Sequence, residues 1–152
     1  IEMRASTRPL CMSGRNREEL DDVIIFDAYA WCEYALDGPH AELIAKELSS
    51  VRQAFTPASV VGELKESMLR HRVKTGTISA ILQYVKSKSS IVNIDAEIAE
   101  RAGDLNFEYK KKIQGWGMLD SIVYSVTLLK KGRVVTGDIH FKKLPNVIYI
   151  GK

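Results

Sequence analysis

Short runs of β-branched and apolar residues alternate along this chain with longer segments in which apolar residues recur at helical spacing. The runs at 23–26, 54–56, 90–94, 133–136 and 146–150 predict strands. The segments 28–36, 40–50, 59–68, 77–86, 96–113 and 119–129 predict helices. Strands alternating with helices indicate an α/β fold. We expect a three-layer sandwich with a central, mostly parallel sheet flanked by helices.

The chain length predicts one domain. The 152 residues are enough for a single core with layers around it, and we place that domain at residues 23–152. Residues 1–22 are polar and lack apolar periodicity, so we interpret them as an extension. Because the chain begins with Ile and both Met3 and Met12 could be natural starts, part of that extension could be sequence added for expression.

Charge and cysteine content narrow the function only slightly. The net charge of +3 and the pI near 8.8 are compatible with a polyanionic partner but do not identify one. Cys11 and Cys32 have no metal-site or disulfide-framework spacing, which favours reduced thiols. No apolar run is long enough to span a bilayer, and no signal-peptide pattern opens the chain. We therefore expect a cytoplasmic protein with no membrane partner.

Acidic residues follow two of the predicted strands directly. Asp27 comes after Val-Ile-Ile-Phe, and Asp138 follows Val-Val-Thr-Gly. Two further acids lie on predicted helices that flank the sheet: Glu63 beside an apolar stripe, and Asp120 at a helix start. In open α/β sheets, ligands bind in a crevice outside the carboxyl ends of the strands. The four acids are therefore candidates for one shared site.

Each acid taken alone also fits an ordinary structural role. Asp27 could cap the helix that it precedes, Asp120 could interact with a helix dipole, and Asp138 could be a turn residue. If the acids converge, two carboxylates about 4 Å apart repel by roughly 4 kcal/mol at an effective dielectric constant near 20. Such a cluster needs protons or a cation, and oxygen ligands favour Mg²⁺ or Mn²⁺ over zinc.

The contexts of these acids resemble those of the PIN-domain ribonucleases over residues 23–150. The matching segments are VIIF before Asp27, SVVGEL with Glu63, LDSIVYSVTLL with Asp120, and VVTGDIHF with Asp138. The last segment is the most specific, since Thr136, Asp138 and Phe141 all match the pattern of that family. The helix after Asp120 departs from the pattern, because residues 123–126 are larger than the alanines often found there. That difference concerns packing rather than the site.

The resemblance implies a metal-dependent endoribonuclease. Asp27, Glu63, Asp120 and Asp138 would be the catalytic, metal-binding acids, with Mg²⁺ or Mn²⁺ activating a water that attacks the RNA phosphodiester. Thr136 should point to the same side of its strand as Asp138 and could support the site. Among basic residues, Lys142 and Lys143 are candidates for RNA contacts. For His140 we favour a structural role over that of a general base.

Small PIN proteins of this length resemble the toxins of VapBC-type toxin–antitoxin pairs. That resemblance implies a homodimer and a small antitoxin protein as partner. Two alternatives stay open: an RNA-processing or decay nuclease without an antitoxin, and a non-catalytic module that binds RNA or protein. A phosphate-accepting receiver-like domain is a weaker alternative, because paired acids directly after the first strand are missing.

Overall fold

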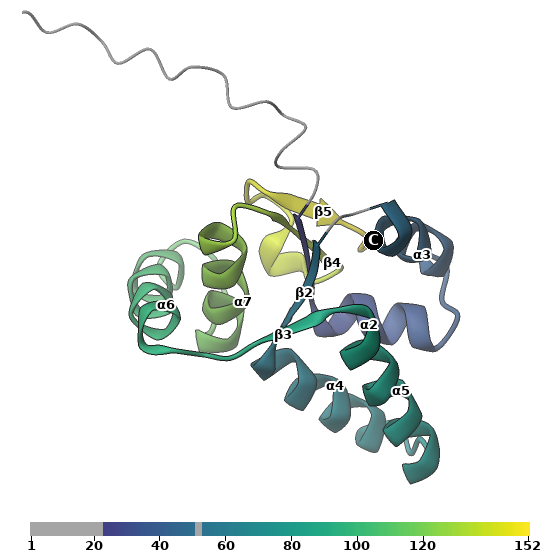
Figure 1. The fold of residues 1–152 in the computed structure, drawn as a ribbon. Coiled ribbons are helices and arrows are strands. Elements are labelled where there is room, and N and C mark those ends of the chain that lie inside the picture. The colour runs from purple at the N-terminus through teal and green to yellow at the C-terminus, as the bar shows by residue number, and fades with distance from the viewer. Residues whose placement is uncertain (1–22, 51–52) are drawn as a thin grey trace, which may run out of the picture.

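The computed structural model describes residues 23–50 and 53–152 (Figure 1). The extension expected at residues 1–22 lies outside this part of the chain. The strands are β1 (Val23–Phe26), β2 (Gln53–Pro57), β3 (Ser90–Val92), β4 (Arg133–Thr136) and β5 (Val147–Tyr149). The helices are α2 (Ala28–Ala35), α3 (Ala41–Ser50), α4 (Ala58–Arg70), α5 (Thr75–Lys88), α6 (Ala96–Tyr109), α7 (Met118–Leu129) and the 3₁₀ helix η1 (Ile139–Phe141).

The strands form one sheet in the order β3-β2-β1-β4-β5. Each neighbouring pair is parallel, and β1 lies at the centre between β2 and β4. Helices α6 and α7 cover one face of the sheet, α2 and α3 cover the other, and α4 and α5 project beyond its carboxyl end (Figure 1). The predicted three-layer α/β sandwich is confirmed.

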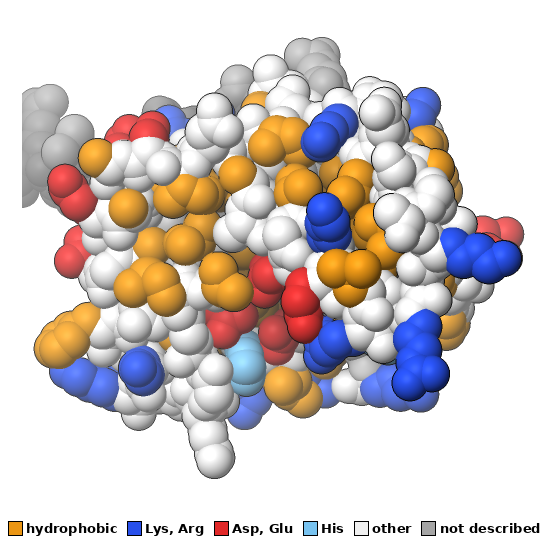
Figure 2. All heavy atoms as spheres, turned by 90° about the horizontal axis from the view of Figure 1, so that it is seen from below, with side chains coloured by type: hydrophobic (Ala, Val, Ile, Leu, Met, Phe, Trp, Pro, Cys, Tyr) orange, Lys and Arg blue, Asp and Glu red, His pale blue; other side chains and the backbone are white. Residues whose placement is uncertain are grey.

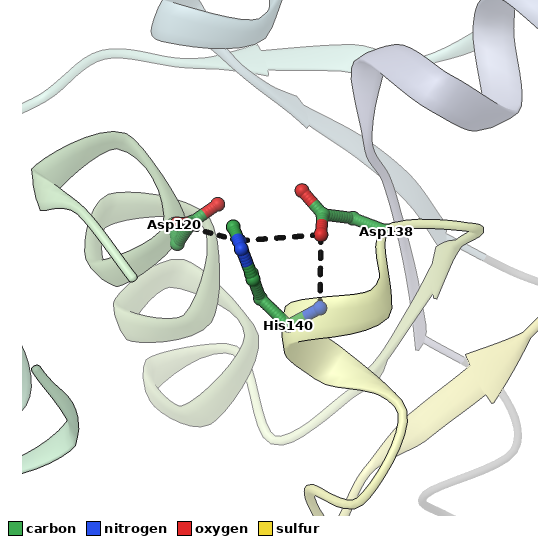
Figure 3. A group of neighbouring side chains, drawn as sticks. All are labelled: Asp120, Asp138 and His140. Carbon is green, nitrogen blue, oxygen red and sulfur yellow. Dashed lines mark hydrogen bonds and ion pairs between the residues drawn. The ribbon is translucent and has the colours of Figure 1, made fainter. Parts of the chain in front are cut away.

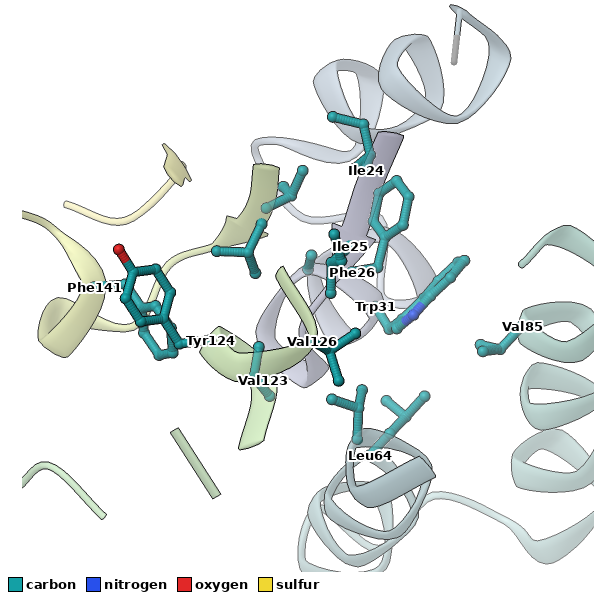
Figure 4. Packing of buried hydrophobic residues seen from close by; sticks show 14 of the residues in the cluster. Ile24, Ile25, Phe26, Trp31, Leu64, Val85, Val123, Tyr124, Val126 and Phe141 are labelled. Atoms are coloured by element: carbon teal, nitrogen blue, oxygen red, sulfur yellow. The ribbon is translucent and has the colours of Figure 1, made fainter. Parts of the chain in front are cut away.

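The core lies on both faces of the central strands. Ile24, Ile25 and Phe26 on β1 are fully buried, as expected for a strand covered on both sides (Figure 4). Trp31 and Trp116 also belong to the core, with only 1% and 2% of their surface exposed. Neither tryptophan is therefore available to stack on a base.

One helix ends earlier than the sequence predicts. Helix α6 was expected to continue to Ile113, but it ends at Tyr109 and the chain then turns. The amides of Lys112 and Ile113 both donate to the Tyr109 carbonyl, which closes the turn. The turn lets Trp116 reach the core, where its ring packs against Tyr109 and Phe141. The third strand is also shorter than predicted, ending at Val92.

Among the described residues, no helix combines the length and the apolar character needed to cross a membrane. The cytoplasmic location stays a prediction.

A buried polar contact ties the sheet to α2. The indole Nε1 of Trp31 donates to Thr56 Oγ1 over 3.1 Å, and Thr56 Oγ1 lies 2.7 Å from Ser89 Oγ. Replacing Thr56→Val keeps the shape but leaves the buried indole N–H without an acceptor. We expect the free energy of unfolding to fall by about 1–3 kcal/mol in urea denaturation. Thr77→Val, at an exposed position on α5, should change it by less than about 0.5 kcal/mol; equal effects of the two substitutions would contradict this assignment.

Candidate functional site

The two strand-end acids are placed by the pairing of β1 with β4. Phe26 is opposite Val135 in the sheet, and the amide of Asp27 donates to the Val135 carbonyl over 3.2 Å. Thr136 ends β4, and Asp138 follows after one residue. Since parallel strands present their carboxyl ends at the same edge, both acids lie at the edge where such sheets bind ligands.

Asp27 is held by two hydrogen bonds. Its Oδ1 accepts from the amide of Ala28 over 2.7 Å, which caps α2, and its Oδ2 accepts from Thr136 Oγ1 over 2.7 Å. The Thr136 hydroxyl in turn accepts from the amide of Asp138 over 3.0 Å. Thr136 therefore links the two strand-end acids and orients the carboxylate of Asp27.

The other two acids reach the same place from helices. Asp120 lies in the first turn of α7, and its Oδ2 accepts from the amide of Gly117 over 2.9 Å. Glu63 is half-buried on α4, beside the core residue Leu64. All four predicted site acids line one pocket of about 210 Å³, together with Ala28, Tyr29, Leu119, Val123 and Gly137. Figure 2 shows acidic side chains gathered in a hollow on this face.

Burial makes these carboxyl groups difficult to ionise. Burial, together with the charges of Asp138 and Asp120, raises the pKa of Asp27 from 3.8 to about 6, although the Thr136 and Ala28 hydrogen bonds oppose the shift. Burial and the charges of the other three acids raise the pKa of Glu63 to about 7. Burial also raises the pKa of Asp120. A bound cation would remove this penalty, since it favours the charged form of every carboxylate near it.

The structure places His140, for which the sequence favours a structural role, among the acids. Its Nδ1 is 3.3 Å from Asp120 Oδ2 and 3.3 Å from Asp138 Oδ1 (Figure 3). Single ligand atoms of Asp120, Asp138 and His140 lie within 4.8 Å of one another, a spacing that would suit one metal ion. The only available signal was the spacing of two residues between Asp138 and His140. The structure thus places an imidazole nitrogen beside two of the predicted acids, and the ligand set itself stays a prediction.

The two candidate RNA-binding lysines lie just after η1. Lys142 and Lys143 are both exposed, and Lys142 Nζ lies 5.4 Å from the centre of the Tyr149 ring on β5. Neither lysine lines the acidic pocket. Their contact with RNA stays a prediction.

Comparison with known proteins identifies the family. The PIN domain family model matches residues 24–147, which is most of the chain. The chain belongs to the PIN-domain family. A search of curated proteins finds no match.

Several solved structures share the fold. VapBC2 from Rickettsia felis, bound to a promoter DNA fragment, gives a TM-score of 0.67 at 18% identity, covering 85% of this chain and 98% of that one. VapC20 from Mycobacterium tuberculosis, a sarcin-ricin loop cleaving toxin, gives a TM-score of 0.65 at 15% identity, covering 82% of this chain and 96% of that one. A toxin–antitoxin complex from Klebsiella pneumoniae gives a TM-score of 0.61 at 21% identity, covering 82% of this chain and 95% of that one. These proteins have the same fold and nearly the same extent as this chain.

The raised pKa of Asp27 predicts how the stability of the metal-free protein depends on pH. Because the folded-state pKa of about 6 lies above the unfolded value of 3.8, this group favours folding most below pH 4, and the contribution is lost as the pH rises through 6. Asp27→Asn keeps the cap but does not ionise. In EDTA, the melting temperature of Asp27→Asn should therefore rise relative to that of wild type between pH 4 and pH 7. The corresponding gain in the free energy of unfolding is about 3 kcal/mol at most.

Asp104→Asn, at an exposed position on α6, is the matched control and should show no such trend. An Asp27→Asn difference that stays constant from pH 4 to pH 7 would contradict the assignment of a buried, repelled carboxylate.

Proposed function

We propose that this protein is a metal-dependent endoribonuclease and the toxin of a VapBC-type toxin–antitoxin pair. The observation that supports it most is the convergence of Asp27, Glu63, Asp120 and Asp138 on one pocket at the carboxyl edge of the sheet. Membership of the PIN family and the fold shared with VapC toxins agree with this function.

The donor set fits a divalent ion. Three of the acids have a raised pKa because they are buried near one another, and a buried imidazole nitrogen lies beside two of them. Mg²⁺ and Mn²⁺ both bind carboxylate oxygen well. When bound, such an ion would polarise the scissile phosphodiester and lower the pKa of an attacking water.

The chain's own residues would orient the ligands and admit the substrate. Thr136 fixes the direction of the Asp27 carboxylate, and the amide of Gly117 fixes that of Asp120. A second pocket of about 510 Å³ shares Tyr29, Glu63 and Leu119 with the acidic pocket and extends to Arg70 on α4. A phosphodiester chain leaving the acids could lie along this groove, where Arg70 would exchange its present partner Glu66, 2.9 Å away, for a phosphate oxygen.

A small apolar segment of an antitoxin is the partner that we propose. Helices α2, α3 and α5 border a largely apolar groove of about 520 Å³, whose accessible wall includes Ala80 and Ile81. Tyr34 and Tyr84 stack across it with ring centres 5.7 Å apart and hydroxyl oxygens 2.8 Å apart. An apolar segment would cover these side chains. We also propose that the toxin forms a homodimer, which the mass measured by light scattering would show.

Cleavage of RNA is the direct test of the proposed activity. A labelled RNA panel would be incubated with wild type in Mg²⁺, Mn²⁺ or EDTA. We expect cleavage with either metal and none in EDTA. Asp27→Asn and Asp138→Asn should each lower the rate at least about 100-fold, since even supporting residues of metal sites are worth up to that factor. Asp104→Asn should retain the wild-type rate, and an Asp138→Asn variant with full activity would contradict the proposal.

Expression in a bacterial host separates a toxin from a processing nuclease. Wild type should arrest growth, and Asp27→Asn should not, because arrest by the toxin requires RNA cleavage. Metal-dependent cleavage without growth arrest would indicate an RNA-processing enzyme. Binding of RNA without cleavage across the panel would instead indicate a non-catalytic module.

A further inference from the structure

His140 occupies a fixed position at the rim of the acidic pocket. It lies in η1, the short helix that follows Asp138, and its backbone amide donates to Asp138 Oδ1 over 2.9 Å. Its side chain is 25% exposed. The hydrogen bond fixes the start of η1 and therefore the point from which the imidazole projects toward α7 (Figure 3).

The imidazole presents one nitrogen to the carboxylates. Nδ1 is equidistant from Asp120 Oδ2 and Asp138 Oδ1, at 3.3 Å from each. This atom is buried, and it lies at ion-pair distance from both carboxylates without the geometry of a hydrogen bond. Two carboxylates this close to one buried nitrogen need a proton on the ring or a metal ion to offset their charge. A cation between the two carboxylates would do so.

The opposite edge of the ring rests against Gly115. A Cβ atom at this position would come within 2.7 Å of His140 Nε2. The backbone of Gly115 has a φ of +86°, which residues with a side chain rarely adopt. The absence of a side chain at 115 thus leaves room for the Nε2 edge. With that edge against the loop, Nδ1 faces Asp120 and Asp138.

We propose that His140 Nδ1 is a ligand of the ion held by Asp120 and Asp138, and that it makes the site select Mn²⁺ over Mg²⁺. The inference rests on the metal-binding part of the proposed function. Mg²⁺ prefers oxygen ligands and keeps several waters, whereas transition ions accept imidazole nitrogen more readily. A set that contains an imidazole nitrogen therefore favours Mn²⁺ more than a set of carboxylates alone would.

Spectroscopy of the Mn²⁺-loaded full chain tests the nitrogen ligand. The metal-stripped protein would receive less than one equivalent of Mn²⁺, and electron spin echo envelope modulation would detect ¹⁴N coupled to the ion. Wild type should show the coupling of a directly bound imidazole. His140→Gln and His140→Asp should lose it, and His71→Gln should retain it, because His71 is exposed and its Nδ1 lies 2.7 Å from the Ser67 carbonyl on α4.

Calorimetric titration of the same proteins tests the selectivity. The ratio of the Mg²⁺ to the Mn²⁺ dissociation constant should fall roughly tenfold in His140→Asp, which restores an all-oxygen site, while His71→Gln keeps the wild-type ratio. Circular dichroism would verify that each variant is folded.

Two results would overturn the inference: Mn²⁺ bound to wild type without ¹⁴N coupling, or an unchanged ratio in folded His140→Asp. The first would mean that the imidazole only pairs with the carboxylates. Neither result bears on cleavage, because the RNA assay with wild type and Asp27→Asn decides the proposed activity separately. Nitrogen-coordinated Mn²⁺ in a protein that cleaves no RNA would support the metal ligand and refute the nuclease.

Discussion

The Thr136 hydroxyl donates to Asp27 Oδ2 across the paired strands β1 and β4, and the site depends on this contact. The same oxygen accepts from the amide of Asp138, so one side chain links acids that are 111 positions apart in the chain. Parallel pairing places both strand ends at one edge, and the hydroxyl then fixes the direction of the buried carboxylate. Without this link, burial alone would favour a protonated, less strictly oriented Asp27.

Burying four acids in one pocket destabilises the fold, and the apolar core offsets this destabilisation. Four acids share a pocket of about 210 Å³, and burial is the main reason why the pKa of Asp27, Glu63 and Asp120 is raised. The apolar residues of β1, which are fully buried on both faces, hold the strand that carries the least exposed of these acids. A structure that keeps carboxylates together against their mutual repulsion is suited to a cation, since the ion converts the repulsion into attraction.

The hydrophobic pattern predicts the strands whose ends carry Asp27 and Asp138, because β-branched runs and the residues after them are local features of the sequence. It also places Glu63 on the helix that carries Leu64, whose burial brings α4 against the rest of the core. The early end of α6 was not predictable in this way. It follows from the burial of Trp116, a tertiary contact that overrides helical periodicity.

The position of His140 also required the structure. Its Nδ1 faces two carboxylates only because η1 turns back toward α7 and the loop at Gly115 leaves space for the ring. Three segments that are separate in the sequence must pack together before that nitrogen has a role. The apolar groove between α2, α3 and α5 arises in the same manner, from the packing of three helices rather than from any motif.

The central claim is that the acidic pocket at the carboxyl edge of the sheet binds a metal ion. Anomalous diffraction from crystals of the protein soaked in Mn²⁺ tests it most directly. The account predicts an anomalous peak within coordination distance of Asp120 and Asp138, inside the pocket that Asp27 and Glu63 also line. No peak in this pocket in Mn²⁺-soaked crystals, or peaks confined to other acidic surfaces, would contradict it.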